Sequence, residues 1–253
     1  ANDHWFRGIN LKYGPAGSVY LIDWYDRNAC HRRNPEIWDR TNGRIYHLWY
    51  GNRTTVQVDL EQQSDLELVD FQLHDNDWFV RTARRILQHR SAIGNLEEGA
   101  RSKLRELVKS DLAPPKLLRV IWTLAAVGEW DTTLAANLFS HPNESVRSWS
   151  VRLSVQEESL TPQLKLAWLK EIESGSSAKL RLAVASALPH IPLKERWEFV
   201  AQLLAHEEDR EDPNIPYLVW FAAEPLVPLD AVRAMELALD SKLPQVAQWI
   251  VQR

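Results

Sequence analysis

The segments FVRTARRIL (79–87), LLRVIWTLA (117–125), SVRSWSVRL (145–153), KLRLAVASA (179–187) and YLVWFAAEP (217–225) align with one another without a gap. In each segment, apolar residues recur three and four positions apart, which places them on one face of a helix. Four of the five carry an arginine in the third position. This self-similarity predicts a stack of helical repeats, in which each unit buries its apolar face against the next.

The aligned positions define an apolar stripe with a charged column beside it. The stripe opens with Val80, Leu118, Val146, Leu180 and Leu218, and continues three residues later with Ala83, Ile121, Trp149, Ala183 and Phe221. The column consists of Arg81, Arg119, Arg147 and Arg181. We expect these arginines to leave the core face and to reach water or a neighbouring carboxylate. The irregular repeat length, near the ~34 to 47 residues of known helical repeats, favours a mainly α, HEAT-like α-α superhelical solenoid.

Further helices are predicted between and beyond these segments from their start signals. Asp131, Thr161 followed by Pro162, and Asp230 are typical residues at the start of a helix. Pro192 and Pro244 also precede runs with apolar residues in helical register. The sequence therefore predicts roughly five helix pairs from about residue 64 to residue 253.

Residues 1–57 belong to a different structural class from the helical repeats of residues 58–253. Residues 5–13, 18–24 and 43–51 are rich in β-branched and aromatic residues and predict a small antiparallel sheet. In the two clearer strands both faces are apolar, so the sheet needs cover on both sides. The helical repeats can cover one side, and we expect further protein on the other.

Composition excludes several classes of function. The net charge of -4 and the pI near 6.1 give no electrostatic case for nucleic-acid binding. No apolar run is long enough for a transmembrane segment, and no signal peptide is present. The single cysteine, Cys30, excludes an internal disulfide. No nucleophile elbow, P-loop, dinucleotide fingerprint or HExxH string occurs.

The chain begins at Ala1 without an initiator methionine, because its only methionine is Met235. Either a leader was removed or the chain is a piece of a longer protein, and the strands with two apolar faces favour the second interpretation.

Several long strings resemble one known family. The run GSVYLIDWYDRNACHRRNPEIWDRTNGRIYHLWYG (17–51) resembles the last β-propeller blade of large bacterial membrane-bound dehydrogenase-like proteins, which are related to sorbosone and glucose dehydrogenases. HDNDWFVRTARRIL (74–87), HPNESVRSWSVRL (141–153), LRLAVASAL (180–188) and DPNIPYLVWFAAEPL (212–226) resemble the HEAT-like region after that propeller. The resemblance implies an exported, electron-transferring parent in the periplasm or cell envelope, with a c-type cytochrome domain beyond the repeats.

The chain also departs from that family. Most of the propeller is absent, and with it the blades that would hold a quinone, a calcium ion or a sugar. Cys30 and His31 supply only half of a CxxCH haem site, because Arg27 stands where the first cysteine would be. We therefore expect no cofactor in this chain, whereas haem c, quinone or calcium would belong to the parent protein.

Charged residues between the second and third predicted strands form one candidate binding site. Asp23, Asp26, His31, Arg32 and Arg33 could line the mouth of a propeller and contact a substrate or metal, because loops at strand ends often carry function. The alternative, which we favour, is a solvated loop whose charges pair with one another.

Other candidate sites have a stronger structural explanation. Most of the twelve tryptophans fall on apolar faces, which indicates core packing, whereas Trp78 and Trp130 precede helices and are better candidates for exposed stacking on a sugar. The acidic stretch HEEDRED (206–212) lacks the pattern of a calcium loop and is expected to be a solvated connection. His74 and His141, each two residues before an asparagine, are expected to serve in turns that cap helices.

Two functional hypotheses of different classes follow. The favoured one is a non-catalytic helical-repeat scaffold that joins a propeller to a redox domain or a protein partner. The alternative is part of a quinone- or haem-linked sugar or alcohol oxidoreductase, with His31 as base and Arg32 or Arg33 as electrostatic stabiliser. A weaker third hypothesis is a free-standing repeat protein that binds a glycan or peptide.

Overall fold

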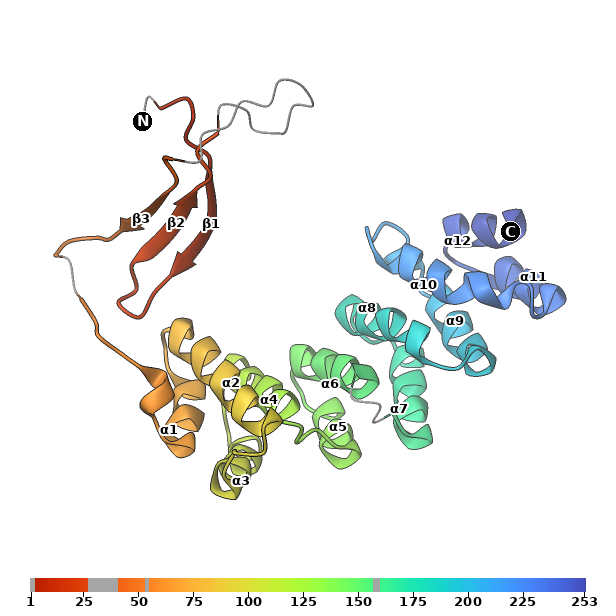
Figure 1. Cartoon of the computed structure of the whole chain (residues 1–253). Coiled ribbons are helices and arrows are strands. Elements are labelled where there is room, and N and C mark those ends of the chain that lie inside the picture. Colours follow the sequence, from red (N-terminus) through yellow and green to blue (C-terminus); the bar gives the residue numbers. More distant parts are fainter. Residues whose placement is uncertain (1–2, 27–40, 53–54, 157–159) are drawn as a thin grey trace. The chain divides into compact units, whose positions relative to one another are not determined.

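The computed structural model describes residues 3–26, 41–52, 55–156 and 160–253. The chain is mainly helical, with a small antiparallel sheet near its N-terminus, as the sequence predicts (Figure 1). The chain splits into two compact units, residues 1–103 and residues 104–253. The division lies inside helix α3, so the first unit contains the sheet together with the first helices.

The sheet consists of β1 (Gly8–Tyr13), β2 (Val19–Asp23) and β3 (Arg44–Leu48) in that spatial order, with antiparallel neighbours. The three strands lie within the three predicted segments. A short turn joins β1 to β2, in which the Gly14 N–H donates to the Ser18 carbonyl over 3.0 Å. A bulge interrupts the β1–β2 register between Ile9 and Lys12.

The helices of the first unit have these bounds: the 3-10 turns Leu60–Gln62 and Phe71–Leu73, α1 (Asp65–Asp70), α2 (Asp77–Ala92) and α3 (Glu98–Leu107). Ser64 begins α1 with a capping box, because its hydroxyl accepts from the Glu67 N–H while the Glu67 carboxylate accepts from the Ser64 N–H. Arg90 of α2 donates to Asp65 over 2.6 Å and so holds α1 against α2.

The start of α2 binds the sheet through the turn after β1. The Asn76 side-chain amide donates to the carbonyls of Gly14 and Pro15, each over 3.1 Å. The Tyr13 hydroxyl donates to Asp77 over 3.2 Å. One asparagine therefore caps α2, through the Trp78 N–H, and fixes the β1–β2 turn to the helix.

The histidine turns are confirmed in both places. His74 Nδ1 accepts from the Asn76 N–H over 2.9 Å, and His141 Nδ1 accepts from the Asn143 N–H over 3.0 Å. In each turn the asparagine then accepts a hydrogen bond from a backbone N–H of the following helix. The two imidazoles thus order the chain before α2 and before α6.

The described helices of the second unit are α4 (Pro114–Ala126), α5 (Thr132–Phe139), α6 (Glu144–Gln156), α7 (Pro162–Glu173), α8 (Ala178–Ala187), α9 (Arg196–Leu204), α10 (Ile215–Ala223), α11 (Ala231–Asp240) and α12 (Pro244–Gln252). Short 3-10 turns cover Leu188–His190, Leu193–Glu195, Glu207–Asp209 and Glu224–Leu226. Asp131, Thr161 and Asp230 cap α5, α7 and α11 as the sequence predicts.

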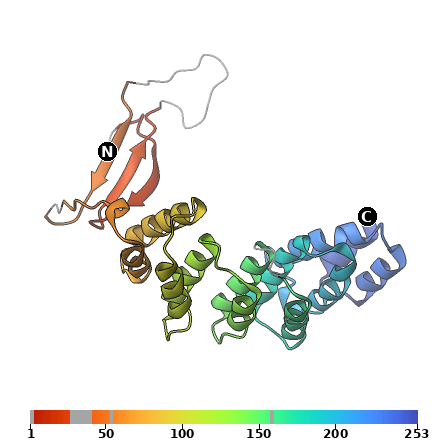
Figure 2. The ribbon, with the colours of Figure 1, turned by 60° about the horizontal axis from the view of Figure 1, so that its bottom comes forward.

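Alternate helices of this unit are neighbours. Helix α6 packs on α4 and α8, and α10 packs on α8 and α12, while α9 packs on α7 and α11. Figures 1 and 2 show this succession from two directions. The repeated segments lie on α2, α4, α6, α8 and α10. The four of these helices that belong to the second unit pack on one another in chain order.

The predicted stripe forms most of the core but fails on α10. Val80, Val146 and Leu180 are fully buried, and Leu118 is half-buried. On α10, Phe221 is 58% exposed, contrary to the prediction, and Val219 and its neighbours face the core instead. The buried side of α10 is thus shifted by one residue, from Leu218 and Phe221 to Val219 and Ala222.

The arginine column is exposed at one end and buried at the other. Arg81 pairs with Asp77 over 3.1 Å at the surface, and Arg147 pairs with Glu171. Arg181, however, is only 3% exposed, which corrects the expectation that the whole column leaves the core. The partner of Arg181 lies in the acidic stretch 206–212, whose predicted solvation is also wrong at one residue: Asp209 is 1% exposed.

Arg181 and Asp209 form a buried two-point ion pair. The distances are 2.5 Å from Nε to Oδ2 and 2.6 Å from Nη2 to Oδ1, and Nη1 donates to the Ser176 carbonyl. The hydrogen bonds to Asp209 raise the pKa of Arg181 above its ordinary value. The pair joins α8 to the connection between α9 and α10.

We expect Leu180→Ala to lower the free energy of unfolding by about 2 to 5 kcal/mol, because it leaves a cavity at a fully buried position. Leu118→Ala should cost less, since that side chain is only half-buried. Chemical denaturation followed by circular dichroism measures both. Equal midpoints for Leu180→Ala and the parent would contradict the assignment of the stripe.

Two arginines of one column provide a matched test of burial. Arg181→Met leaves Asp209 charged and buried, and should cost about 3 to 5 kcal/mol. Arg147→Ala removes a partly exposed pair and should cost about 1 kcal/mol. The double variant Arg181→Met/Asp209→Leu should recover much of the first loss. If Arg181→Met and Arg147→Ala lose equal stability in thermal unfolding, burial does not make the loss of an arginine partner more costly.

Candidate functional site

The predicted loop site is only partly placed by the structure. His31, Arg32 and Arg33 lie outside the described residues. Asp23 ends β2 and is buried, and its Oδ1 accepts from the N–H groups of Arg7 over 2.8 Å and Tyr25 over 3.0 Å. The Asp26 N–H donates to the Trp5 carbonyl over 2.9 Å. Asp23 therefore fixes the chain on both sides of the strand end, and its Oδ2 has no partner among the described residues.

The two tryptophans selected for exposure differ in their surroundings. Trp78 is half-buried and meets Phe79 edge to face, with ring centres 5.1 Å apart. Trp130 is only 8% exposed and belongs to the core of the second unit, so its predicted exposure is wrong. Gly128, at φ +78°, follows the end of α4 in the left-handed conformation that often terminates a helix.

One face of the sheet is apolar and open. Ile9 pairs with Ile22 and Ile22 with Ile45, so three isoleucines lie side by side across the strands. Their exposed fractions are 45%, 40% and 76%. Tyr20 and His47, which pair across β2 and β3, lie on this face as well, and Trp24 and Trp49 directly follow the two strands at positions that continue the alternation. We call the apolar and aromatic members of this set, Ile9, Tyr20, Ile22, Trp24, Ile45 and Trp49, the isoleucine face.

The opposite face is covered in part by the chain itself, although Leu48 on this face is 50% exposed. The Phe6 ring meets Tyr46 edge to face with ring centres 5.6 Å apart. It also lies so close to Gly8 that a Cβ there would be 2.7 Å from the ring, which only glycine avoids. Leu21 contacts the same place. Of the two apolar faces that the sequence predicts, the described part of the first unit thus covers one in part and leaves the isoleucine face open.

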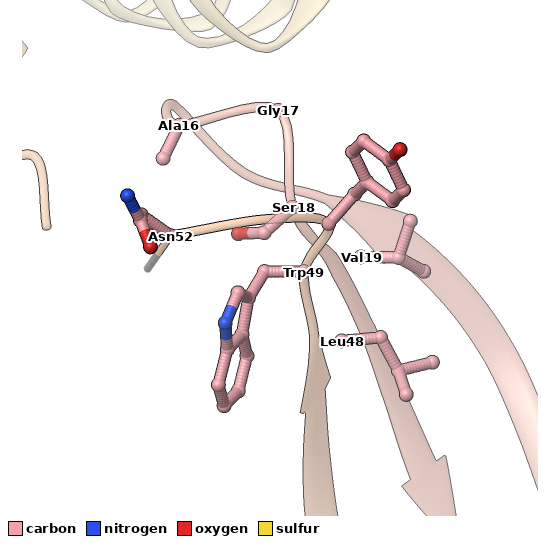
Figure 3. Close-up of a pocket in the computed structure, with 8 residues that line it drawn as sticks. Ala16, Gly17, Ser18, Val19, Leu48, Trp49 and Asn52 are labelled. Carbon is pink, nitrogen blue, oxygen red and sulfur yellow. The ribbon is translucent and has the colours of Figure 1, made fainter. Parts of the chain in front are cut away.

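A pocket of about 450 Å³ lies where the β1–β2 turn meets the end of β3. Figure 3 shows Ser18 between the Trp49 indole and the turn residues Ala16 and Gly17, with Asn52 across the opening. The Ser18 hydroxyl and His47 Nε2 share a hydrogen bond of 2.6 Å, and the imidazole stacks on Tyr20 with ring centres 4.3 Å apart. This pair is not predictable from the sequence, because only the strand register brings the two residues together.

A serine and a histidine in hydrogen-bond contact lie beside this pocket. A serine beside a histidine is the start of a catalytic arrangement, but the base needs a third group that orients it. Among the described residues, no carboxylate is bonded to His47. The hydrogen bond instead satisfies a serine that is only 7% exposed. The aromatic and amide groups around it provide a surface for packing and hydrogen bonding.

The acidic stretch offers no open calcium site. Asp209 is held by Arg181, and Glu208 lies 3.0 Å from His206 and 3.2 Å from Arg181. A hydrogen bond from its own backbone, and then one from His206, hold the pKa of Glu208 below its usual value. Within residues 3–26, 41–52, 55–156 and 160–253, no three His, Cys, Asp or Glu side chains gather as metal ligands.

No family model, curated protein or solved structure matches this chain. Among the described helices, none combines the length and apolar character needed to cross a membrane.

Proposed function

We propose that this chain is a non-catalytic scaffold and protein-interaction region, which binds a partner protein or a neighbouring domain through the isoleucine face. The exposure of that face is the observation that carries the proposal. Three aligned isoleucines with three flanking aromatic side chains form a contiguous apolar patch, which is typical of surfaces that another protein covers. Full burial of one such side chain stabilises a complex by up to about 1.5 to 3 kcal/mol.

The shape of the partner surface follows from the sheet. A sheet of three strands needs cover on an apolar face for independent stability, and Phe6 supplies it on one side only. A second sheet packed face to face, about 10 Å away, would interdigitate with the isoleucine rows. This arrangement is that of neighbouring blades in a propeller, and it supports the proposal that the chain is a portion of a larger, exported dehydrogenase-like protein of the periplasm or cell envelope.

The helices are proposed to form a HEAT-like α-α solenoid. Three observations support this. Helices of the second unit are neighbours in alternation, the aligned segments occupy one series of these neighbours, and the histidine turn recurs before α2 and α6. A solenoid of this kind would give the scaffold an extended surface that holds the sheet-bound partner and a redox domain on one protein.

One observation favours the alternative, an oxidoreductase site completed by residues outside this chain. The buried Asp23 carboxylate has an oxygen without a partner among the described residues, at the point where the chain enters the segment with His31, Arg32 and Arg33. His31→Ala in the full-length parent separates the two functions. Unchanged dye-linked sugar oxidation supports the scaffold, whereas loss of oxidation with retained partner binding supports the alternative.

The scaffold proposal predicts that Ile45→Lys abolishes binding to the native partner without unfolding the chain, since the side chain is 76% exposed. Val232→Lys on α11, at a position 73% exposed, is the matched control and should bind as the parent does. Affinity capture from extracts of the source cells, with circular dichroism of each variant, measures this. Binding that survives Ile45→Lys, or that falls equally in both variants, would refute the isoleucine face as the docking surface.

A further inference from the structure

An asparagine followed by a glycine lies directly before β3. Asn42 and Gly43 belong to no helix or strand, because β3 begins at Arg44. Gly43 is exposed, and Asn42 is half-buried, so water reaches both residues. Gly43 is the one glycine of the sequence that follows an asparagine. An asparagine side chain in this setting can react with the backbone nitrogen of the next residue.

The backbone at Gly43 has the freedom that this reaction needs. The Gly43 nitrogen must approach the side-chain carbonyl carbon of Asn42, and a side chain on residue 43 would obstruct the approach. Glycine has no Cβ. Apart from the chain neighbours of Gly43, no heavy atom of the described residues lies within 4 Å of the place where a Cβ would stand. Among these residues, none closes over this side of Gly43.

Two other asparagines of the chain are held in place. The Asn76 amide donates to two carbonyls of the β1–β2 turn, and its oxygen accepts from the Trp78 N–H. The Asn143 oxygen accepts from the Ser145 N–H. In each case the next residue is the first of an α-helix, α2 or α6, so the backbone that would have to move is fixed. Asn76 and Asn143 therefore differ from Asn42 in the two properties that the reaction requires.

We propose that Asn42 is a site of spontaneous deamidation through a cyclic imide. The Gly43 nitrogen attacks Cγ of Asn42, so that a bond from this nitrogen to Cγ forms and the bond from Cγ to Nδ2 breaks. The proton of the Gly43 nitrogen leaves with Nδ2, and ammonia is released. Water then opens the ring. Addition at Cγ gives aspartate, and addition at the main-chain carbonyl carbon gives isoaspartate.

The isoaspartate product changes the entrance to β3. Its main chain runs through the former side chain and is longer by a carbon atom, and its free carboxylate adds a negative charge close to Arg44 in the sequence. The register of β3 on β2 begins with Arg44 opposite Asp23 and continues with Ile45 opposite Ile22. The added length has to be absorbed beside the first pair, so the pair of Arg44 with Asp23 opens first.

Peptide mapping of the intact chain tests the proposal. The purified, folded protein is kept in mildly alkaline buffer, and the chymotryptic peptide 39–46 is followed by mass spectrometry with fragmentation that distinguishes aspartate from isoaspartate. Asn42 should convert progressively to a mixture of both products, while Asn76 and Asn143 stay intact. Three results would overturn the proposal: equal conversion of all three asparagines, aspartate without isoaspartate, or conversion of Asn42 only after unfolding in urea.

Gly43→Ala is the matched variant. The φ angle of Gly43 lies outside the left-handed region and the added methyl group has open space, so the fold is retained. Conversion of Asn42 should slow by about tenfold or more, because the Cβ obstructs the nitrogen. An unchanged rate would show that the Gly43 nitrogen is not the attacking group.

Amide hydrogen exchange tests the effect on the strand. The isoaspartyl form, separated from the parent by ion exchange, should exchange the amides of peptide 39–46 faster than the parent does. Equal exchange in the two forms would contradict the opening of the first pair of β3.

Discussion

Most of the described helices in the second unit are too short to be stable by themselves, and this constraint determines how the unit is built. Helices α8, α9 and α10 contain ten, nine and nine residues, below the roughly 12 to 15 at which an isolated helix becomes marginal in water. Each must bury an apolar stripe against its neighbours. Because Leu180 and Val184 of α8 are fully buried among residues from several helices, loss of one contact weakens more than one helix.

A buried ion pair connects α8 to the turn between α9 and α10 in addition to the apolar packing. The turn between α9 and α10 carries the acidic stretch, and Arg181 takes one of its carboxylates into the interior. A buried ion pair contributes little net stability compared with apolar residues, but removing one partner is costly. The pair therefore fixes where this turn sits relative to α8. In the first unit, the Asn76 amide does the same for the sheet and α2 with neutral hydrogen bonds.

Features with a local cause were predictable from the sequence. The caps at Asp131, Thr161 and Asp230, and the turns at His74 and His141, depend on residues within a few positions of one another. The rotation of α10, the burial of Trp130 and the partner of Arg181 depend on how helices meet in space. The same holds for the candidate sites, because strand register creates the isoleucine face and the Ser18–His47 pair. Periodicity showed which apolar residues share one face of a helix or strand, but not which of these faces is left uncovered.

The isoleucine face consists mainly of apolar side chains on a sheet, and the proposed partner surface is another apolar sheet. Carbene footprinting of the native protein from its source, compared with the isolated chain, tests this central claim. Peptides that contain Ile22 and Ile45 should label in the isolated chain and be protected in the native protein, while the peptide with exposed Leu166 labels equally in both. Equal labelling of Ile22 and Ile45 in the two samples would contradict the account.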